Sequence, residues 1–125
     1  MDIIKKIRKL YQGNILLHPP YLGENTEEIP EELLSILRIS NGISETIVHP
    51  KSGEKIVIEW IIYPHEMMVS DTAFYQTEYQ VEGIVFSGDG AGNPYLLKSN
   101  GTVTQFDGID GTETEKAHSL EDFWG

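Results

Sequence analysis

The chain has 125 residues, which suits one domain spanning 1–125, and the absence of cysteine excludes disulfides, thiolate metal sites and a cysteine nucleophile. Its formal net charge of −11 repels nucleic-acid phosphates and favours basic partners, so we expect no nucleic-acid ligand. No apolar run approaches the ~20 residues of a membrane helix, and the N-terminus lacks a signal-peptide pattern, so we expect a cytoplasmic protein without membrane contact.

The first elements along the chain are two helices separated by a loop. Apolar residues at helical spacing predict a short amphipathic helix over 2–11, which packs its apolar stripe on the domain or lies on a membrane. Packing is favoured because the helix is so short. The segment 12–28 is rich in proline and glycine and is typical of a loop. A second helix follows, with Pro30 at its first position and Asn41-Gly42 at its C-terminal cap.

The middle of the chain carries β signals and then a further helix. Two β-branched runs flank residues 50–53 and predict a hairpin. Its second strand, 56–63, is apolar on both faces, so we expect it in the centre of a sheet. Residues 65–79 are expected to be helical, with a break or a new cap at Asp71-Thr72.

The last third of the chain predicts a β-meander and a final helix. Residues 83–106 contain three apolar runs, separated by a glycine-rich turn and by Asn100-Gly101, which is typical of a three-stranded meander. Asp107-Gly108 and Asp110-Gly111 indicate a loop. Ser119 is expected to cap a final helix through Phe123 and Trp124.

The glycine-rich stretch GIVFSGDGAGNPYLLK, residues 83–98, admits three interpretations: a phosphate loop, a metal loop or a tight turn. A phosphate loop needs Lys and then Ser or Thr after its last glycine, whereas Asn93-Pro94 stand there. A calcium loop starting at Asp89 would place Asn100 where a bidentate glutamate is required. The tight turn remains, and we predict neither a cofactor nor a metal site.

Other catalytic patterns are incomplete. The zinc-protease pattern begun by His65-Glu66 lacks its second histidine, because Val69 stands there. Asp107 and Asp110 could form an acid–base pair, although their Asp-Gly context indicates turns. We therefore expect no catalytic residue. The alternative is a small enzyme that uses Asp89, Asp107 and Asp110, and it requires these carboxylates to converge in one pocket with at least one raised pKa.

The order of these motifs resembles that of the SMI1/KNR4 family, also called the SUKH superfamily. The matching stretches run from Ile29 to the end of the chain and read IPEELLSILRISNG, IEWIIYPHEM, FYQTEY, IVFSGDGAGNPYLLKSNGTV and HSLEDFW. The resemblance implies an α+β domain with a mostly antiparallel sheet, here the hairpin plus the meander, flanked by helices. The residues that match the family pattern are interpreted as framework positions: Pro30, Asn41, Gly42, Asp89, Gly90, Gly92 and Asn93.

The resemblance also implies a binding function. Many bacterial members are immunity proteins that neutralise a toxin encoded beside them, and eukaryotic members are scaffolding proteins linked to cell-wall synthesis and signalling. We therefore expect a non-catalytic immunity protein for a basic toxin, such as a nuclease, with a scaffold module as the alternative. The candidate contact residues mix acids with aromatics: Glu66, Asp71, Tyr75, Glu78, Tyr79 and Glu82. Core packing is the alternative for the two tyrosines, and the sequence predicts no oligomeric state.

Overall fold

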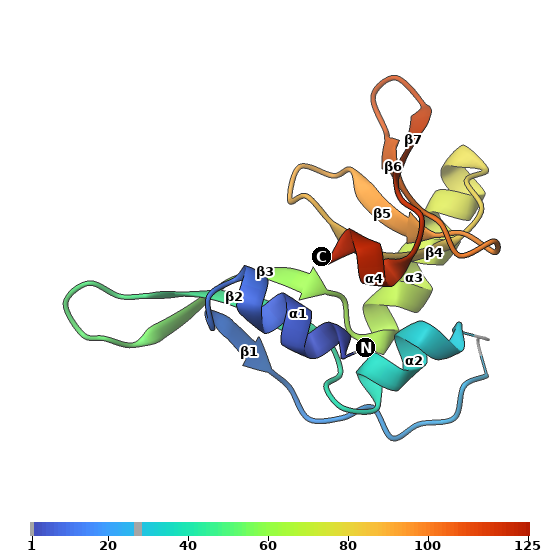
Figure 1. Ribbon diagram of the computed structural model, residues 1–125. Helices are drawn as coiled ribbons and strands as arrows, with labels where there is room; N and C mark the ends of the chain where they lie inside the picture. Colours follow the sequence, from blue (N-terminus) through green and yellow to red (C-terminus); the bar gives the residue numbers. More distant parts are fainter. Residues whose placement is uncertain (1, 27–28) are drawn as a thin grey trace.

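The computed structural model describes residues 2–26 and 29–125, which form two antiparallel sheets and four helices (Figure 1). The first sheet has the order β1-β2-β3, and the second has the order β4-β5-β6-β7. The strands are β1 (Ile15–Leu17), β2 (Ile43–Val48), β3 (Lys55–Ile62), β4 (Ile84–Gly88), β5 (Pro94–Leu97), β6 (Val103–Asp107) and β7 (Thr112–Ala117). The predicted α+β class with antiparallel pairing is confirmed, but the strands divide between two sheets.

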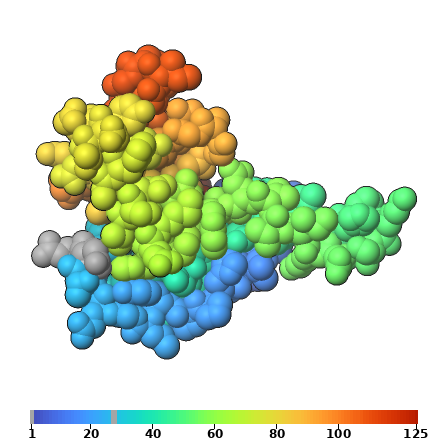
Figure 2. All heavy atoms as spheres, turned by 180° about the vertical axis from the view of Figure 1, so that it is seen from behind, coloured from blue at the N-terminus to red at the C-terminus, as the bar shows by residue number. Residues whose placement is uncertain are grey.

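The first sheet contains the predicted hairpin, β2 and β3, but its strand positions differ from the prediction. β3 lies at the edge of the sheet, and β2 is the central strand because β1 pairs with its other side. β1 forms within the predicted loop 12–28, of which residues 27 and 28 lie outside the described part of the chain. The hairpin projects beyond the rest of the molecule (Figures 1 and 2), which is why both faces of residues 55–59 are exposed.

The second sheet contains the predicted meander as β4, β5 and β6. A fourth strand, β7, was not predicted. Residues 107–111 form the turn of a β6–β7 hairpin, and Gly111 has a φ of +72°, which only glycine adopts readily. Residues 112–116 of β7 are exposed, and its sequence, TETEKA, contains no apolar run. The sequence pattern therefore did not predict a strand here.

The helices are α1 (Ile3–Leu10), α2 (Glu31–Leu37), α3 (His65–Tyr79) and α4 (Leu120–Phe123). α1 packs Ile4 and Ile7 into the core. Ser119 caps the start of α4, as predicted, and its side chain accepts a hydrogen bond from Asp122 N. α3 runs without a break through Asp71-Thr72, contrary to the prediction. The Thr72 hydroxyl accepts a hydrogen bond from Val85 N in β4 instead of capping a new helix. None of the described helices has both the length and the apolar character that crossing a membrane requires.

The predicted ends of α2 are wrong in detail. Pro30 is the N-cap residue, one position before the helix, and the helix ends at Leu37 with Arg38 as its C-cap. Asn41 instead accepts a hydrogen bond from His65 N, at 2.8 Å, and so caps the start of α3. Gly42 has a φ of +90°, and a Cβ there would lie 2.7 Å from the Trp60 ring. Both residues thus fix where β2 and α3 begin.

The two sheets are joined through the last residues of β3 and the middle of β4. Tyr63 N donates to Phe86 O at 2.9 Å, and the Ser87 hydroxyl donates to Ile61 O at 2.6 Å. These hydrogen bonds hold the end of β3 beside β4. The main core lies against the apolar faces of α1, α2 and α4. It includes the fully buried residues Leu33, Leu37, Ile62 and Phe86.

Candidate functional site

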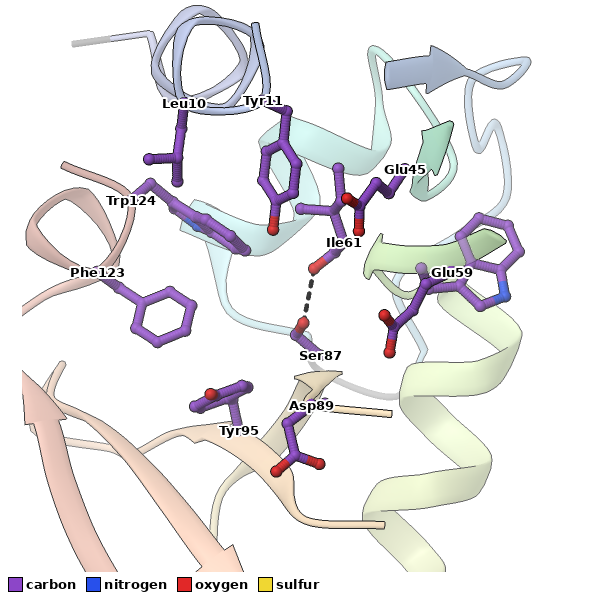
Figure 3. A pocket seen from close by; sticks show the side chains of 12 residues that line it. Leu10, Tyr11, Glu45, Glu59, Ile61, Ser87, Asp89, Tyr95, Phe123 and Trp124 are labelled. Atoms are coloured by element: carbon purple, nitrogen blue, oxygen red, sulfur yellow. Dashed lines mark hydrogen bonds between the residues drawn. The ribbon is translucent and has the colours of Figure 1, made fainter. Parts of the chain in front are cut away.

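A cavity of about 310 Å³ lies where the two sheets meet (Figure 3). Its lining residues come from α1, β2, β3, β4, β5 and α4, which the fold brings together from distant parts of the chain. No lysine, arginine or histidine is among them. No basic side chain in the lining therefore compensates the carboxylates of the cavity.

Two carboxylates in this cavity lie directly opposite each other. Glu45 in β2 is the register partner of Glu59 in β3, and both line the cavity. Directly opposed residues in an antiparallel pair have Cβ atoms ~5 Å apart, so like charges at these positions destabilise the sheet. Within residues 2–26 and 29–125, neither side chain has a hydrogen-bond donor or an ion-pair partner. The Glu45–Glu59 pair is thus an uncompensated pair of negative charges.

A β-bulge creates this pair. Near the turn, the hairpin register runs Val48 to Lys55, Ile47 to Ile56 and Thr46 to Val57. A regular continuation would place Ile58 opposite Glu45. The register shifts between Glu45 and Thr46 instead, so that Ile58 is passed over and Glu59 becomes the partner. Bulges re-aim side chains in this way and are enriched next to functional sites.

Aromatic rings form the other part of the cavity. Tyr95 and Phe123 pack edge to face with ring centroids 4.9 Å apart. The ring centroids of Phe123 and Trp124 are 4.7 Å apart. Burial raises the pKa of Tyr11, and the charges of Glu45 and Glu59 raise it further. Burial and the charge of Asp89 likewise raise the pKa of Tyr95, against a hydrogen bond from Gln105 that lowers it. The phenols therefore remain neutral in a negative field.

The glycine-rich loop borders the cavity and has the geometry of a tight turn. Asp89 Oδ1 accepts hydrogen bonds from Ala91 N at 2.8 Å and Asn93 N at 3.3 Å, and Oδ2 accepts one from Asn93 Nδ2 at 3.2 Å. Gly90 and Gly92 have φ values of +79° and +87°. The positive φ of Gly90 favours glycine, and a Cβ at this position would also displace the Glu59 carboxylate.

The hydrogen bonds of the loop also set the charge of Asp89. Partial burial alone would raise the pKa of this carboxyl, but the bonds from Ala91 and Asn93 lower it overall. Gln105 Nε2 adds a further bond to Oδ2 at 3.1 Å. Asp89 is therefore ionised, and its oxygens are occupied by its own turn, in contrast to those of Glu45 and Glu59.

A smaller hollow of about 180 Å³ lies on the other side of the loop. Asp71, Tyr63 and Tyr75 line it, and the Tyr75 hydroxyl donates to Gly92 O at 3.2 Å. Burial raises the pKa of Asp71. The pKa of Tyr63 is raised to about 12, mainly by burial and further by electrostatic interactions with Asp71, Tyr75, Glu59 and Asp89. Tyr63 thus lies in the field of carboxylates from both hollows.

The structure brings together only part of the predicted contact set. Asp71 and Tyr75 line the smaller hollow. Glu66 and Glu78 lie exposed near opposite ends of α3, roughly 18 Å apart along its axis. Tyr75 and Tyr79 both pack on Phe106, with ring centroids 6.0 and 5.1 Å away, although Tyr79 is 41% exposed. Glu82 lies beyond the end of α3, where its carbonyl accepts a bond from Lys98 Nζ.

The three aspartates of the enzyme alternative each cap a turn of their own. Asp107 Oδ1 accepts from Ile109 N at 2.8 Å, and Asp110 Oδ1 accepts from Thr112 N at 3.0 Å. Hydrogen bonds from Thr112 lower the pKa of Asp110, and the pKa of Asp89 is lowered as well. Each carboxylate is therefore occupied by its own turn, and the geometry does not bring the three together as this alternative requires.

Most residues of the cavity were absent from the predicted set, including Glu45, Glu59, Tyr11, Tyr95 and Trp124. Among the described residues, no three His, Asp or Glu side chains are grouped so that they could hold a metal ion. Comparisons of the chain with protein-family models, curated proteins and solved structures find no match. The resemblance to the SMI1/KNR4 family therefore rests on its motifs, and function has to be inferred from the site.

Proposed function

We propose that the protein is a non-catalytic binding protein of the immunity type, which neutralises a basic toxin by covering its active site. The observation that carries this proposal is the Glu45–Glu59 pair in the cavity between the sheets, which no basic side chain of the described chain neutralises. The proposal includes no cofactor or metal. It includes a cytoplasmic location, where such a toxin would act on nucleic acid.

The cost of the pair supports a role in binding. Like charges directly opposite in a sheet destabilise it by roughly 0.2–1 kcal/mol, and local conflicts of this kind are expected where function requires them. The chain does neutralise carboxylates elsewhere, because Lys98 Nζ contacts Glu113 at 2.7 Å and Lys6 Nζ contacts Glu121 at 3.6 Å. A partner that supplies a cation to Glu45 and Glu59 would remove the conflict on binding.

The composition and the resemblance point to the same partner. A net charge of −11 speeds the approach of a basic protein and disfavours acidic ones. Nuclease toxins need basic grooves to hold nucleic acid, so an acidic surface with aromatic rings can occupy such a groove. The rings around the cavity provide the large apolar contacts that dominate the energy of protein interfaces.

Co-expression with the toxin-like product of the neighbouring gene tests the proposal. We expect a stable complex and restored growth of the host cells. The double variant Glu45→Gln/Glu59→Gln should weaken both, because it removes two charges while retaining shape. Glu31→Gln, which removes an exposed charge in the first turn of α2, serves as the matched control and should behave as wild type. No complex and no rescue of growth would reject the immunity role, whereas a complex without rescue would favour the scaffold alternative.

A further inference from the structure

The cavity at the sheet junction has two chemically different sides. Figure 3 shows Glu45 and Glu59 on one side and Phe123 and Trp124 on the opposite side, with Tyr11 above them. Carboxylates bind cations through charge-assisted hydrogen bonds, and aromatic faces attract the same cations through their quadrupoles. A ligand that uses both sides is a cation with a flat or apolar part.

Size and shape narrow the ligand further. A volume of about 310 Å³ is at the small end of ligand sites and suits one long side chain rather than a larger molecule. A guanidinium is planar, offers five donors that can serve two carboxylates, stacks on aromatic rings and is less strongly hydrated than an ammonium group. Arginine therefore matches this cavity better than lysine does.

Trp124 adds an independent observation. Its side chain is 5% exposed, and its indole nitrogen has no hydrogen-bond partner among the described residues. Figure 3 shows the indole reaching from α4 into the cavity. Because the nitrogen itself is enclosed by the chain, a ligand in the cavity meets the face of the indole rather than its N–H group. The cavity thus offers carboxylate acceptors for a cationic group and aromatic faces for the rest of the same side chain.

We infer that this cavity is the binding site for one arginine residue of the partner protein, an inference that rests on the proposed function. Glu45 and Glu59 accept hydrogen bonds from the guanidinium, and the aromatic rings, including the Trp124 indole, pack against its side chain. Such a buried arginine, enclosed by aromatic rings, would be the central anchor of the interface. The remaining negative surface would act mainly on the rate of association.

The test uses N-acetyl-arginine-N-methylamide as the probe, which carries the side chain and the flanking carbonyls. Both tryptophans of the chain, Trp60 and Trp124, line the cavity, so fluorescence and the two indole N–H signals in NMR spectra report on it directly. We expect saturable binding with a Kd on the order of 1 mM and a shift of the Trp124 indole signal. The lysine analogue should bind about tenfold more weakly, and the uncharged citrulline analogue should not bind.

Variants separate this site from general charge attraction. Glu59→Gln should weaken arginine binding at least about tenfold, and Glu45→Gln provides a second measurement if the first variant folds poorly. Glu31→Gln, the same change at an exposed carboxylate on α2, should leave binding unchanged. Equal binding of the arginine and citrulline derivatives, equal binding of arginine and lysine, or unchanged binding by both variants would overturn the inference. Growth rescue without arginine binding would reject this site and leave the proposed function, whereas arginine binding without a complex or rescue would reject the immunity role alone.

Discussion

Asp89 and the Glu45–Glu59 pair line the same cavity, yet the fold treats these carboxylates in opposite ways. Asp89 accepts four hydrogen bonds, from Ala91 N, from Asn93 N and Nδ2, and from Gln105 Nε2. Neither Glu45 nor Glu59 has a donor or a cation within the described part of the chain. The difference indicates that Asp89 stabilises the glycine-rich loop, whereas the two glutamates are available to bind a partner.

The largest expected effect comes from removing the carboxylate that the fold uses. Asp89→Ala should lower the free energy of unfolding by about 2 kcal/mol, because the backbone N–H groups of the loop lose a shared acceptor. The lowered pKa of Asp89 means that its contribution is present above the ordinary value of 3.8 and is lost as the pH falls through its folded-state value. The difference from wild type should therefore shrink in acid. Urea unfolding at several pH values measures this, and a constant difference would contradict it.

The next effect tests the contact between the glycine-rich loop and Glu59. Gly90 and Gly92 both have positive φ, but only a Cβ at Gly90 would meet the Glu59 carboxylate, since nothing lies within 4 Å of one at Gly92. Alanine at either position should cost about 1 kcal/mol of stability from backbone strain. Only Gly90→Ala should also change the affinity for the arginine derivative, because it displaces Glu59. Equal effects of the two variants on that affinity would contradict the description of the cavity.

A smaller effect of opposite sign is expected for the glutamates. Glu45→Gln or Glu59→Gln should raise the free energy of unfolding by about 0.5 kcal/mol, because each relieves repulsion across the two strands. The gain should diminish at high salt, which screens exposed charges. Thermal unfolding at low and high salt checks both points. A loss of stability in either variant would show that the carboxylate has an internal partner.

Asp71 gives the smallest effect and a pH dependence of the opposite sense to that of Asp89. Burial raises its pKa above the ordinary value of 3.8, so between the two values the folded protein binds more protons than the unfolded one. Stability from this group is therefore full at low pH and falls as the pH rises through that window. Asp71→Asn should stabilise the protein by roughly 0.3 kcal/mol at neutral pH. At about pH 3 it should have no stabilising effect. The same gain at both pH values would contradict this assignment.

Local sequence patterns predicted most elements of the fold. The α2 segment, the 45–63 hairpin and the meander were visible because apolar spacing and turn residues agree with the final structure. β7 escaped because an exposed polar strand has no apolar pattern. β3 was misplaced because its apolar residues project from the molecule instead of lying in a central strand.

The candidate site was harder to predict because it depends on register and on long-range contacts. Counting outward from the hairpin turn pairs Glu45 with Ile58, and only the bulge replaces Ile58 by Glu59. Tyr11 and Trp124 come from opposite ends of the chain and meet at the cavity through packing of α1 and α4. The predicted set on α3 followed a mixture of acids and aromatics along one segment, which does not determine which side chains share a surface.

A double-mutant cycle on Glu45 and Glu59 tests the central claim most directly. The free energies of unfolding of wild type, Glu45→Gln, Glu59→Gln and the double variant give the interaction energy of the two carboxylates. The structure predicts a repulsive interaction of roughly 0.2–1 kcal/mol in the free protein, and a saturating concentration of the arginine derivative should abolish it. An interaction energy of zero, or an attractive one, in the free protein would contradict the claim that this pair is left for a partner to neutralise.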